Sequence, residues 1–231
     1  MIKYACEAAK PLYSINPYTK KEGVEVKKIV FIGDSIMYGV DLKGMKGYGF
    51  YVREALRRRA EVILPLENCQ DTRFTFSVLS ELFEPGELEG ADLIYWNNGL
   101  WDVMHFGNNA TPVVPKERYG LLLERIFVKL KELSPDAKII FATTTPVIEE
   151  RYTSLGIHRK NAEILGYTCV AREVLGDKVA LIDDLYSVAS NFPHECRSED
   201  PTHFSELGSQ KLAEHILALI DTMINGNVKQ Y

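Results

Sequence analysis

An apolar run beginning at Lys28 ends in the tight sequence Gly33-Asp34-Ser35. Uninterrupted β-branched and aromatic residues are typical of a strand that is buried on both faces in a parallel sheet. Glycine permits a sharp turn, and Asp34 and Ser35 are residue types that cap helices, so Ser35 is expected at the carboxyl end of this strand. Open α/β sheets bind their ligands beyond that edge. Ser35 is therefore either a nucleophile in need of a base or a capping residue without chemistry.

Four further apolar runs alternate with segments of helical periodicity. The expected strands are 28–32, 62–64, 91–97, 138–142 and 179–182. The expected helices are 50–59, 74–83, 116–133, 159–175, 183–189 and 205–224. This alternation predicts an α/β fold, because each right-handed crossover returns the chain over a parallel sheet. We expect a three-layer α/β/α sandwich of flavodoxin-like topology, with a five-stranded parallel sheet in the strand order 2-1-3-4-5.

The 231 residues fit a single domain, since one core can serve a chain of up to roughly 250 residues. Residues 1–26 are polar and are expected to form an extended arm or a small edge strand, followed by one domain over residues 27–231. Residues 38–48 are rich in glycine and are expected to form a loop. Another long loop follows the third expected strand, and loops of that length are usually functional or disordered.

The formal net charge of −5 argues against a nucleic-acid partner, because phosphate binding needs a clustered positive field. The basic run at residues 57–59 ends an expected helix, where cations complement the helix dipole. The four cysteines form no paired motif, so we expect reduced thiols, no metal and no cofactor. No run is long enough for a membrane span and no leader is evident, which favours a soluble, cytoplasmic protein. A signal peptide that has already been removed stays open.

A second motif, Asp200-Pro201-Thr202-His203, directly precedes the last expected helix. A serine hydroxyl is a poor nucleophile until a base takes its proton, and an imidazole base needs a partner that fixes its tautomer. Asp200 and His203 could supply both functions from one loop. The alternative is a solvent-exposed turn without chemistry.

Together, the two motifs and the α/β pattern between them resemble the SGNH, or GDSL-type, hydrolase family over residues 28–224. Gly33-Asp34-Ser35 is similar to the nucleophile block of that family, and Asp200-Pro201-Thr202-His203 matches its Asp-x-x-His block. The resemblance implies that Ser35 is the nucleophile, His203 the general base and then acid, and Asp200 the orienting carboxylate.

The third block of the family departs from its usual form in this chain. It normally reads Gly-x-Asn-Asp, with the asparagine amide donating to the oxyanion, whereas the aligned residues here are Gly99-Leu100-Trp101-Asp102. Asn97 and Asn98 lie just upstream, in a form that looks like an Asn-x-Gly-Leu-His/Trp-Asp subset of the family. We assign the amide donor to Asn97, with Asn98 as the alternative.

The second block of the family normally supplies a glycine N–H to the oxyanion hole. This chain has no glycine between residues 65 and 85, so a backbone N–H of Asp71, Thr72 or Arg73 must serve instead, and we assign Thr72. The N–H of Ser35 completes the expected oxyanion hole. Preorganised donors of this kind are commonly worth about 3 kcal/mol each.

Four residues near the expected site are candidates for substrate binding: Asp34, Asn98, Trp101 and His105. Core or loop packing is the alternative for the aromatic residues, and a loop-holding hydrogen bond is the alternative for Asp34. The loop near His105 is polar rather than greasy, which favours a polar substrate.

The favoured function is a serine esterase that removes a short acyl group, preferably acetyl, from a small-molecule ester such as an acylated sugar. One alternative is a lysophospholipase or thioesterase with the same triad. Another is a non-catalytic carbohydrate- or nucleotide-binding module, although residues 33–39 match neither the dinucleotide nor the P-loop spacing.

Overall fold

The computed structural model describes residues 26–40, 44–152 and 156–225. The predicted arm, residues 1–26, therefore lies outside the described residues apart from Val26. Within the described ranges, no helix is long and apolar enough to cross a membrane.

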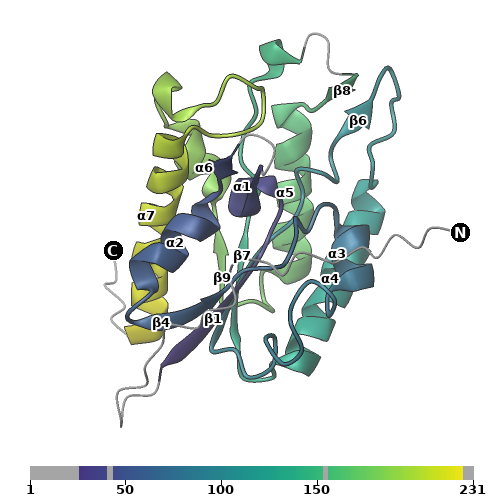
Figure 1. Cartoon of the computed structure of the whole chain (residues 1–231). Helices are drawn as coiled ribbons and strands as arrows, with labels where there is room; N and C mark the ends of the chain where they lie inside the picture. The colour runs from purple at the N-terminus through teal and green to yellow at the C-terminus, as the bar shows by residue number, and fades with distance from the viewer. Residues whose placement is uncertain (1–25, 41–43, 153–155, 226–231) are drawn as a thin grey trace, which may run out of the picture.

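A five-stranded parallel sheet forms the centre of the fold (Figure 1). Its strands, in spatial order, are β4 (Ala60–Ile63), β1 (Lys27–Ile32), β5 (Leu93–Asn97), β7 (Lys138–Ala142) and β9 (Leu181–Asp183). This confirms the predicted order 2-1-3-4-5. Strand β1 pairs with both β4 and β5, and its apolar residues Ile29 to Ile32 are fully buried. An uninterrupted apolar run is what such a central strand requires.

Helices cover both faces of the sheet, which confirms the three-layer sandwich. Helices α2 (Tyr48–Leu56) and α7 (Glu206–Asn225) lie on one face in Figure 1. Helices α3 (Thr72–Val78), α4 (Lys116–Leu133) and α5 (Asn161–Leu175) lie on the other. The short helices α1 (Ser35–Tyr38) and α6 (Leu185–Ser190) follow β1 and β9, and 3-10 turns cover Glu149–Arg151 and His194–Cys196.

Two small antiparallel ribbons differ from the predicted loops. Strand β2 (Gly39–Val40) pairs with β3 (Met45–Lys46), and β6 (His105–Phe106) pairs with β8 (Ile157–His158). Strands of two residues are too short for sequence alternation to reveal. In the first ribbon Gly39 is required, because its φ is +106° and a Cβ atom would meet the Met45 carbonyl oxygen at 2.3 Å.

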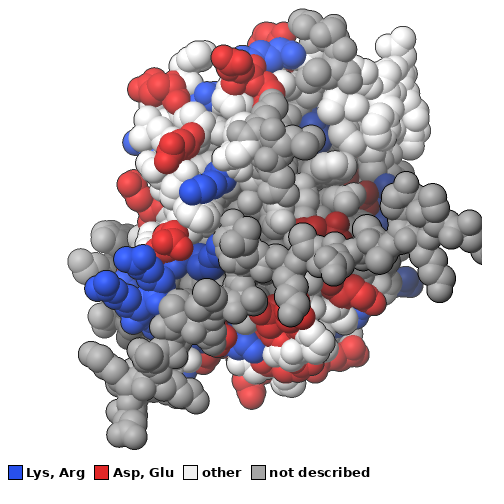
Figure 2. Space-filling model, in the orientation of Figure 1, with Lys and Arg blue, Asp and Glu red and all other residues white. Residues whose placement is uncertain are grey.

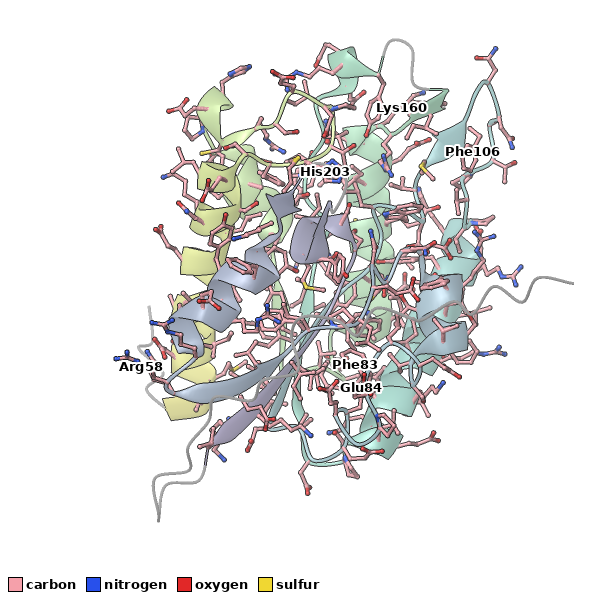
Figure 3. All side chains as sticks on the ribbon, in the orientation of Figure 1. Arg58, Phe83, Glu84, Phe106, Lys160 and His203 are labelled. Carbon is pink, nitrogen blue, oxygen red and sulfur yellow. The ribbon has the colours of Figure 1, made fainter. Side chains whose placement is uncertain are left out.

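The basic run lies at the end of α2, as predicted. Figure 2 shows basic side chains gathered in this region, where Figure 3 labels Arg58. Arg57 Nη1 lies 3.8 Å from Glu54 Oε2, and Arg59 forms an ion pair with Asp221 of α7. Part of this positive charge is therefore balanced by neighbouring acids.

Candidate active site

Ser35 is the first residue of α1, directly beyond the carboxyl end of β1. Asp34 caps this helix, because its Oδ1 accepts the Ile36 N–H at 2.9 Å. Asp34 is fully buried, and its Oδ2 has no hydrogen-bond partner among the described residues. Burial raises the pKa of Asp34, and the Ile36 N–H opposes that rise. The predicted substrate-binding role of Asp34 is not supported, because its carboxyl group holds the turn from inside the protein.

His203 brings the two sequence motifs together. Its Nε2 lies 2.8 Å from Ser35 Oγ, and its Nδ1 lies 3.0 Å from each carboxylate oxygen of Asp200. Figure 3 shows the labelled His203 beyond the upper edge of the sheet, in the region of α1. These are the contacts expected if His203 serves as a base for Ser35 and is oriented by Asp200.

Asp200 is held in its ionised form. Burial alone would raise its pKa, but hydrogen bonds from the His203 ring and from the N–H groups of His203 and Thr202 hold the pKa below its usual range. An ionised carboxylate at Nδ1 fixes the imidazole tautomer and stabilises the cation that forms when Nε2 takes a proton. The three side chains can therefore activate the Ser35 hydroxyl.

Two openings with a partly shared lining lie on this side of the molecule. The smaller is lined by Ser35, Ile36, Gly39, Met45, Lys46, Gly47, His203, Phe204 and Ser209. The larger is lined by Gly44, Met45, Lys46, Tyr51, Phe204 and Glu206. The two share Met45, Lys46 and Phe204. No sequence motif marks this shared lining, because β3 and the segment before α7 meet only in the folded chain.

Asn97 and Asn98 point to different neighbours. Asn97 Nδ2 donates to the Ala142 carbonyl oxygen at 2.9 Å, toward β7 and away from β1. Asn98 Nδ2 donates to the Gln70 carbonyl oxygen and to Thr75 Oγ1, both at 3.0 Å. These contacts do not favour the predicted oxyanion role of Asn97 or the alternative of Asn98. The substrate contact of Asn98 stays a prediction.

Thr72 is not supported as the predicted oxyanion donor. It is fully buried, and its N–H and Oγ1 donate to Asp102 Oδ1 at 3.1 Å and 2.5 Å. The alternative Arg73 N–H donates to Asp71 Oδ1 at 2.9 Å. Of the three proposed N–H groups, only that of Asp71 has no acceptor among the described residues.

Gln70 is the residue in this loop that the sequence did not reveal. Its φ is +50°, and no other non-glycine residue in the described ranges has a positive φ. Glycine is the residue that adopts this conformation without strain. Gln70 therefore has the backbone conformation that glycine adopts most easily, in the loop where the family has its second-block glycine. Its N–H is already used, because it donates to Asn68 Oδ1 at 2.9 Å.

His105 does not reach the openings. Its Nε2 lies 3.0 Å from Glu163 Oε2, its Nδ1 lies 3.0 Å from the Asn109 carbonyl oxygen, and its ring stacks on His158. The buried His105 therefore ties the β6–β8 ribbon to α5, and its substrate-binding role stays a prediction that these contacts do not favour. Trp101 is partly exposed, and its substrate-binding role stays a prediction.

Comparisons with known proteins give one sequence relative and many structural neighbours. No protein-family model matches the chain. A GDSL esterase/lipase of Arabidopsis thaliana is 26% identical over 210 residues, which cover 82% of this chain and 84% of the relative.

Two solved structures illustrate the shared fold. A lipase/acylhydrolase from Enterococcus faecalis has a TM-score of 0.65 at 20% identity and covers 84% of this chain and 95% of its own. A serine-to-alanine catalytic mutant of Axe2, an acetylxylan esterase from Geobacillus stearothermophilus, has a TM-score of 0.57 at 18% identity, with coverages of 84% and 94%.

Proposed function

We propose that this chain, which belongs to the SGNH (GDSL-type) hydrolases, is a carboxylic ester hydrolase that removes short acyl groups from an acylated carbohydrate through an acyl-enzyme. The observation that carries the proposal is the continuous hydrogen-bond chain from Ser35 Oγ through the His203 ring to Asp200. The esterase names of the relatives support the reaction class.

In the proposed mechanism, Ser35 Oγ attacks the ester carbonyl while its proton passes to His203 Nε2. The tetrahedral intermediate collapses, His203 returns the proton to the leaving alcohol, and the acyl group stays bonded to Ser35. His203 then takes a proton from water as the water oxygen attacks the acyl-enzyme. The bond between the acyl carbon and Ser35 Oγ breaks, His203 returns the proton to Ser35 Oγ, and the carboxylic acid is released. Asp200 stays ionised throughout and stabilises the imidazolium.

The oxyanion needs donors that are not already used. The Ser35 N–H has no acceptor among the described residues, and it lies on the residue whose oxygen attacks. We assign the first donor to this N–H and the second to the Asp71 N–H in the loop after β4. Such donors stabilise the transition state because they meet the charge as it develops.

The openings support the choice of substrate. The smaller one has Met45 and Phe204 in its lining together with Ser35, and the little room that it offers beside the hydroxyl favours a short acyl group such as acetyl over a long chain. The larger one presents Lys46, Tyr51 and Glu206, which offer a donor, an aromatic ring and an acceptor to a polyhydroxylated alcohol. The acetylxylan esterase among the neighbours supports a carbohydrate as that alcohol.

The test compares acetylated xylo-oligosaccharide with 4-nitrophenyl acetate, butyrate and octanoate. Wild type should prefer acetate over octanoate. Glu206→Gln should lower kcat/KM for the acetylated sugar about tenfold, the effect of losing a hydrogen bond to a charged group, with less than about twofold change for nitrophenyl acetate.

Glu214→Gln, an exposed change on the same helix, is the control and should match wild type on every substrate. A preference for octanoate would contradict the short-acyl assignment. If Glu206→Gln lowers kcat/KM equally for the acetylated sugar and for 4-nitrophenyl acetate, the larger opening does not receive the sugar.

A further inference from the structure

Arg159 is a buried cation between β8 and α5. It is 5% exposed. Among the residues that the structure describes, no carboxylate forms an ion pair with its guanidinium group. Burying a charge without a counter-ion is costly, so its hydrogen bonds to neutral groups must compensate.

Those hydrogen bonds join three separate segments. Arg159 Nε donates to the Leu100 carbonyl oxygen, in the loop after β5. Nη1 donates to Tyr152 Oη at 3.1 Å and to Thr202 Oγ1 at 3.4 Å. Tyr152 Oη and Thr202 Oγ1 are themselves 2.8 Å apart, and Nη2 lies 3.3 Å from Met104 Sδ. A rigid planar group with donors on several sides suits such a junction.

Two of these partners adjoin the candidate site in sequence. Thr202 precedes His203, whose Nε2 contacts Ser35 Oγ at 2.8 Å. Leu100 precedes Trp101, which stands where the family places its oxyanion asparagine. Burial raises the pKa of Asp34, and Arg159 is one of the groups that oppose this rise, so its charge is felt beside Ser35.

Neighbouring arginines hold the same loop differently. Arg151 Nη1 donates to the Ser198 carbonyl oxygen, and Arg197 Nη1 donates to that of Pro146 at 2.8 Å. Both bind backbone carbonyls and shape the loop itself. Of these three arginines, Arg159 is the one that links the loop to the end of β5.

We infer that Arg159 is a positioning residue, whose planar fork fixes Thr202, and through it the His203 ring, relative to the loop that follows β5. The inference rests on the proposed esterase function. A base that is displaced by about 1 Å can cost a hundredfold in rate, so the loss should appear in kcat rather than in substrate binding.

The first experiment measures kcat and KM for 4-nitrophenyl acetate in Arg159→Lys and Arg159→Met. Lysine keeps the charge but cannot reach Leu100 and Thr202 together, whereas methionine removes both charge and donors. We expect kcat to fall about tenfold or more in both variants, with KM within about twofold. Arg172→Met is the control and should keep wild-type kcat. It removes an exposed arginine of α5 that forms an ion pair with Asp184.

The second experiment changes the other partner and decides the question if an Arg159 variant does not fold. Thr202→Val removes the hydroxyl at nearly constant volume and should lower kcat several-fold. Thr202→Ser keeps the hydroxyl and should therefore keep a kcat close to that of wild type. In the double mutant of Arg159→Lys and Thr202→Val, the fold-loss in kcat should be smaller than the product of the two single fold-losses, because both changes remove the same hydrogen bond.

Two failures are distinguishable. If wild type and Arg172→Met neither hydrolyse nitrophenyl acetate nor react with a fluorophosphonate, the proposed function is wrong. If they react normally while folded Arg159→Lys keeps wild-type kcat, or Thr202→Val equals Thr202→Ser, the positioning role is wrong and the esterase function stands.

Discussion

Asp102 is a buried acid that the proposed mechanism does not use. Its Oδ1 accepts two hydrogen bonds from Thr72, while Oδ2 has no partner among the described residues. Burial raises the pKa of Asp102 to about 7, although the Thr72 hydrogen bonds oppose the rise. An acid whose folded pKa lies above the unfolded value of about 3.9 contributes stability at low pH and loses it as the pH rises through about 7.

Asp102→Asn should therefore become relatively more stable as the pH rises. Asparagine keeps an acceptor for Thr72 and resembles the protonated acid, so the variant should gain on the order of 2 kcal/mol over wild type between pH 5 and pH 8.5. Urea unfolding at the two pH values measures this difference. The exposed Asp136→Asn is the control, and an equal offset at both pH values would show that Asp102 is ionised throughout.

The residues of the site differ in how far the sequence predicted them. Ser35, Asp200 and His203 belong to short motifs, and their roles stay predictions although their contacts are present. The partners of Asn97 and Thr72 could not be predicted, because each depends on which neighbouring strand or loop the side chain faces. The positive φ of Gln70 likewise carries no local sequence signal.

At the scale of whole elements, a contact between a histidine and an acid ties helix α7 to the sheet. His215 Nε2 lies 2.7 Å from Asp183 Oδ1 at the end of β9, and Asp183 Oδ2 accepts a hydrogen bond from Tyr95 Oη at 2.6 Å. The Asp183 carboxylate raises the pKa of His215, with burial opposing the shift. The His215 imidazole thus links α7 to β9 and, through Asp183, to β5.

The stability that His215 contributes should be largest in acid. A raised folded pKa makes this contribution fully present below the unfolded value of about 6.5 and lost as the pH rises through the folded value. The free energy of unfolding of wild type minus that of His215→Gln should therefore be greater at pH 5.5 than at pH 9. Glu214→Gln on the same helix should show no such trend, and equal differences at both pH values would contradict the ion pair.

Elements with strong periodicity were predicted well. Helix α4 has the expected bounds, 116–133. Its apolar residues recur with helical periodicity and mark the buried face, and the following Ser134-Pro135 marks its end. The end of α3 differs, at Val78 rather than residue 83. The β2–β3 and β6–β8 ribbons were not predicted, since strands of two residues show no alternation and their pairing is set by how the chain folds.

At the scale of the whole molecule, the strand order followed from the alternation of apolar strands and helices. Right-handed crossovers leave few topologies for five parallel strands, and β1 carries the uninterrupted burial of a central strand. That order places the end of β1 beside the Asp200–His203 loop, although the two motifs are 168 residues apart at Ser35 and His203. The fold thus assembles the site from opposite ends of the chain.

The most direct test of the central claim is covalent labelling of Ser35 by a fluorophosphonate, measured by intact-protein and peptide mass spectrometry. We expect one adduct per chain, located on Ser35, with labelling about a thousandfold slower in His203→Ala. Ser209→Ala removes another serine that lines the same opening and should label like wild type, whereas Ser35→Ala should not label. Hydrolysis of nitrophenyl acetate with no adduct on Ser35, or undiminished turnover in Ser35→Ala, would contradict the nucleophile assignment.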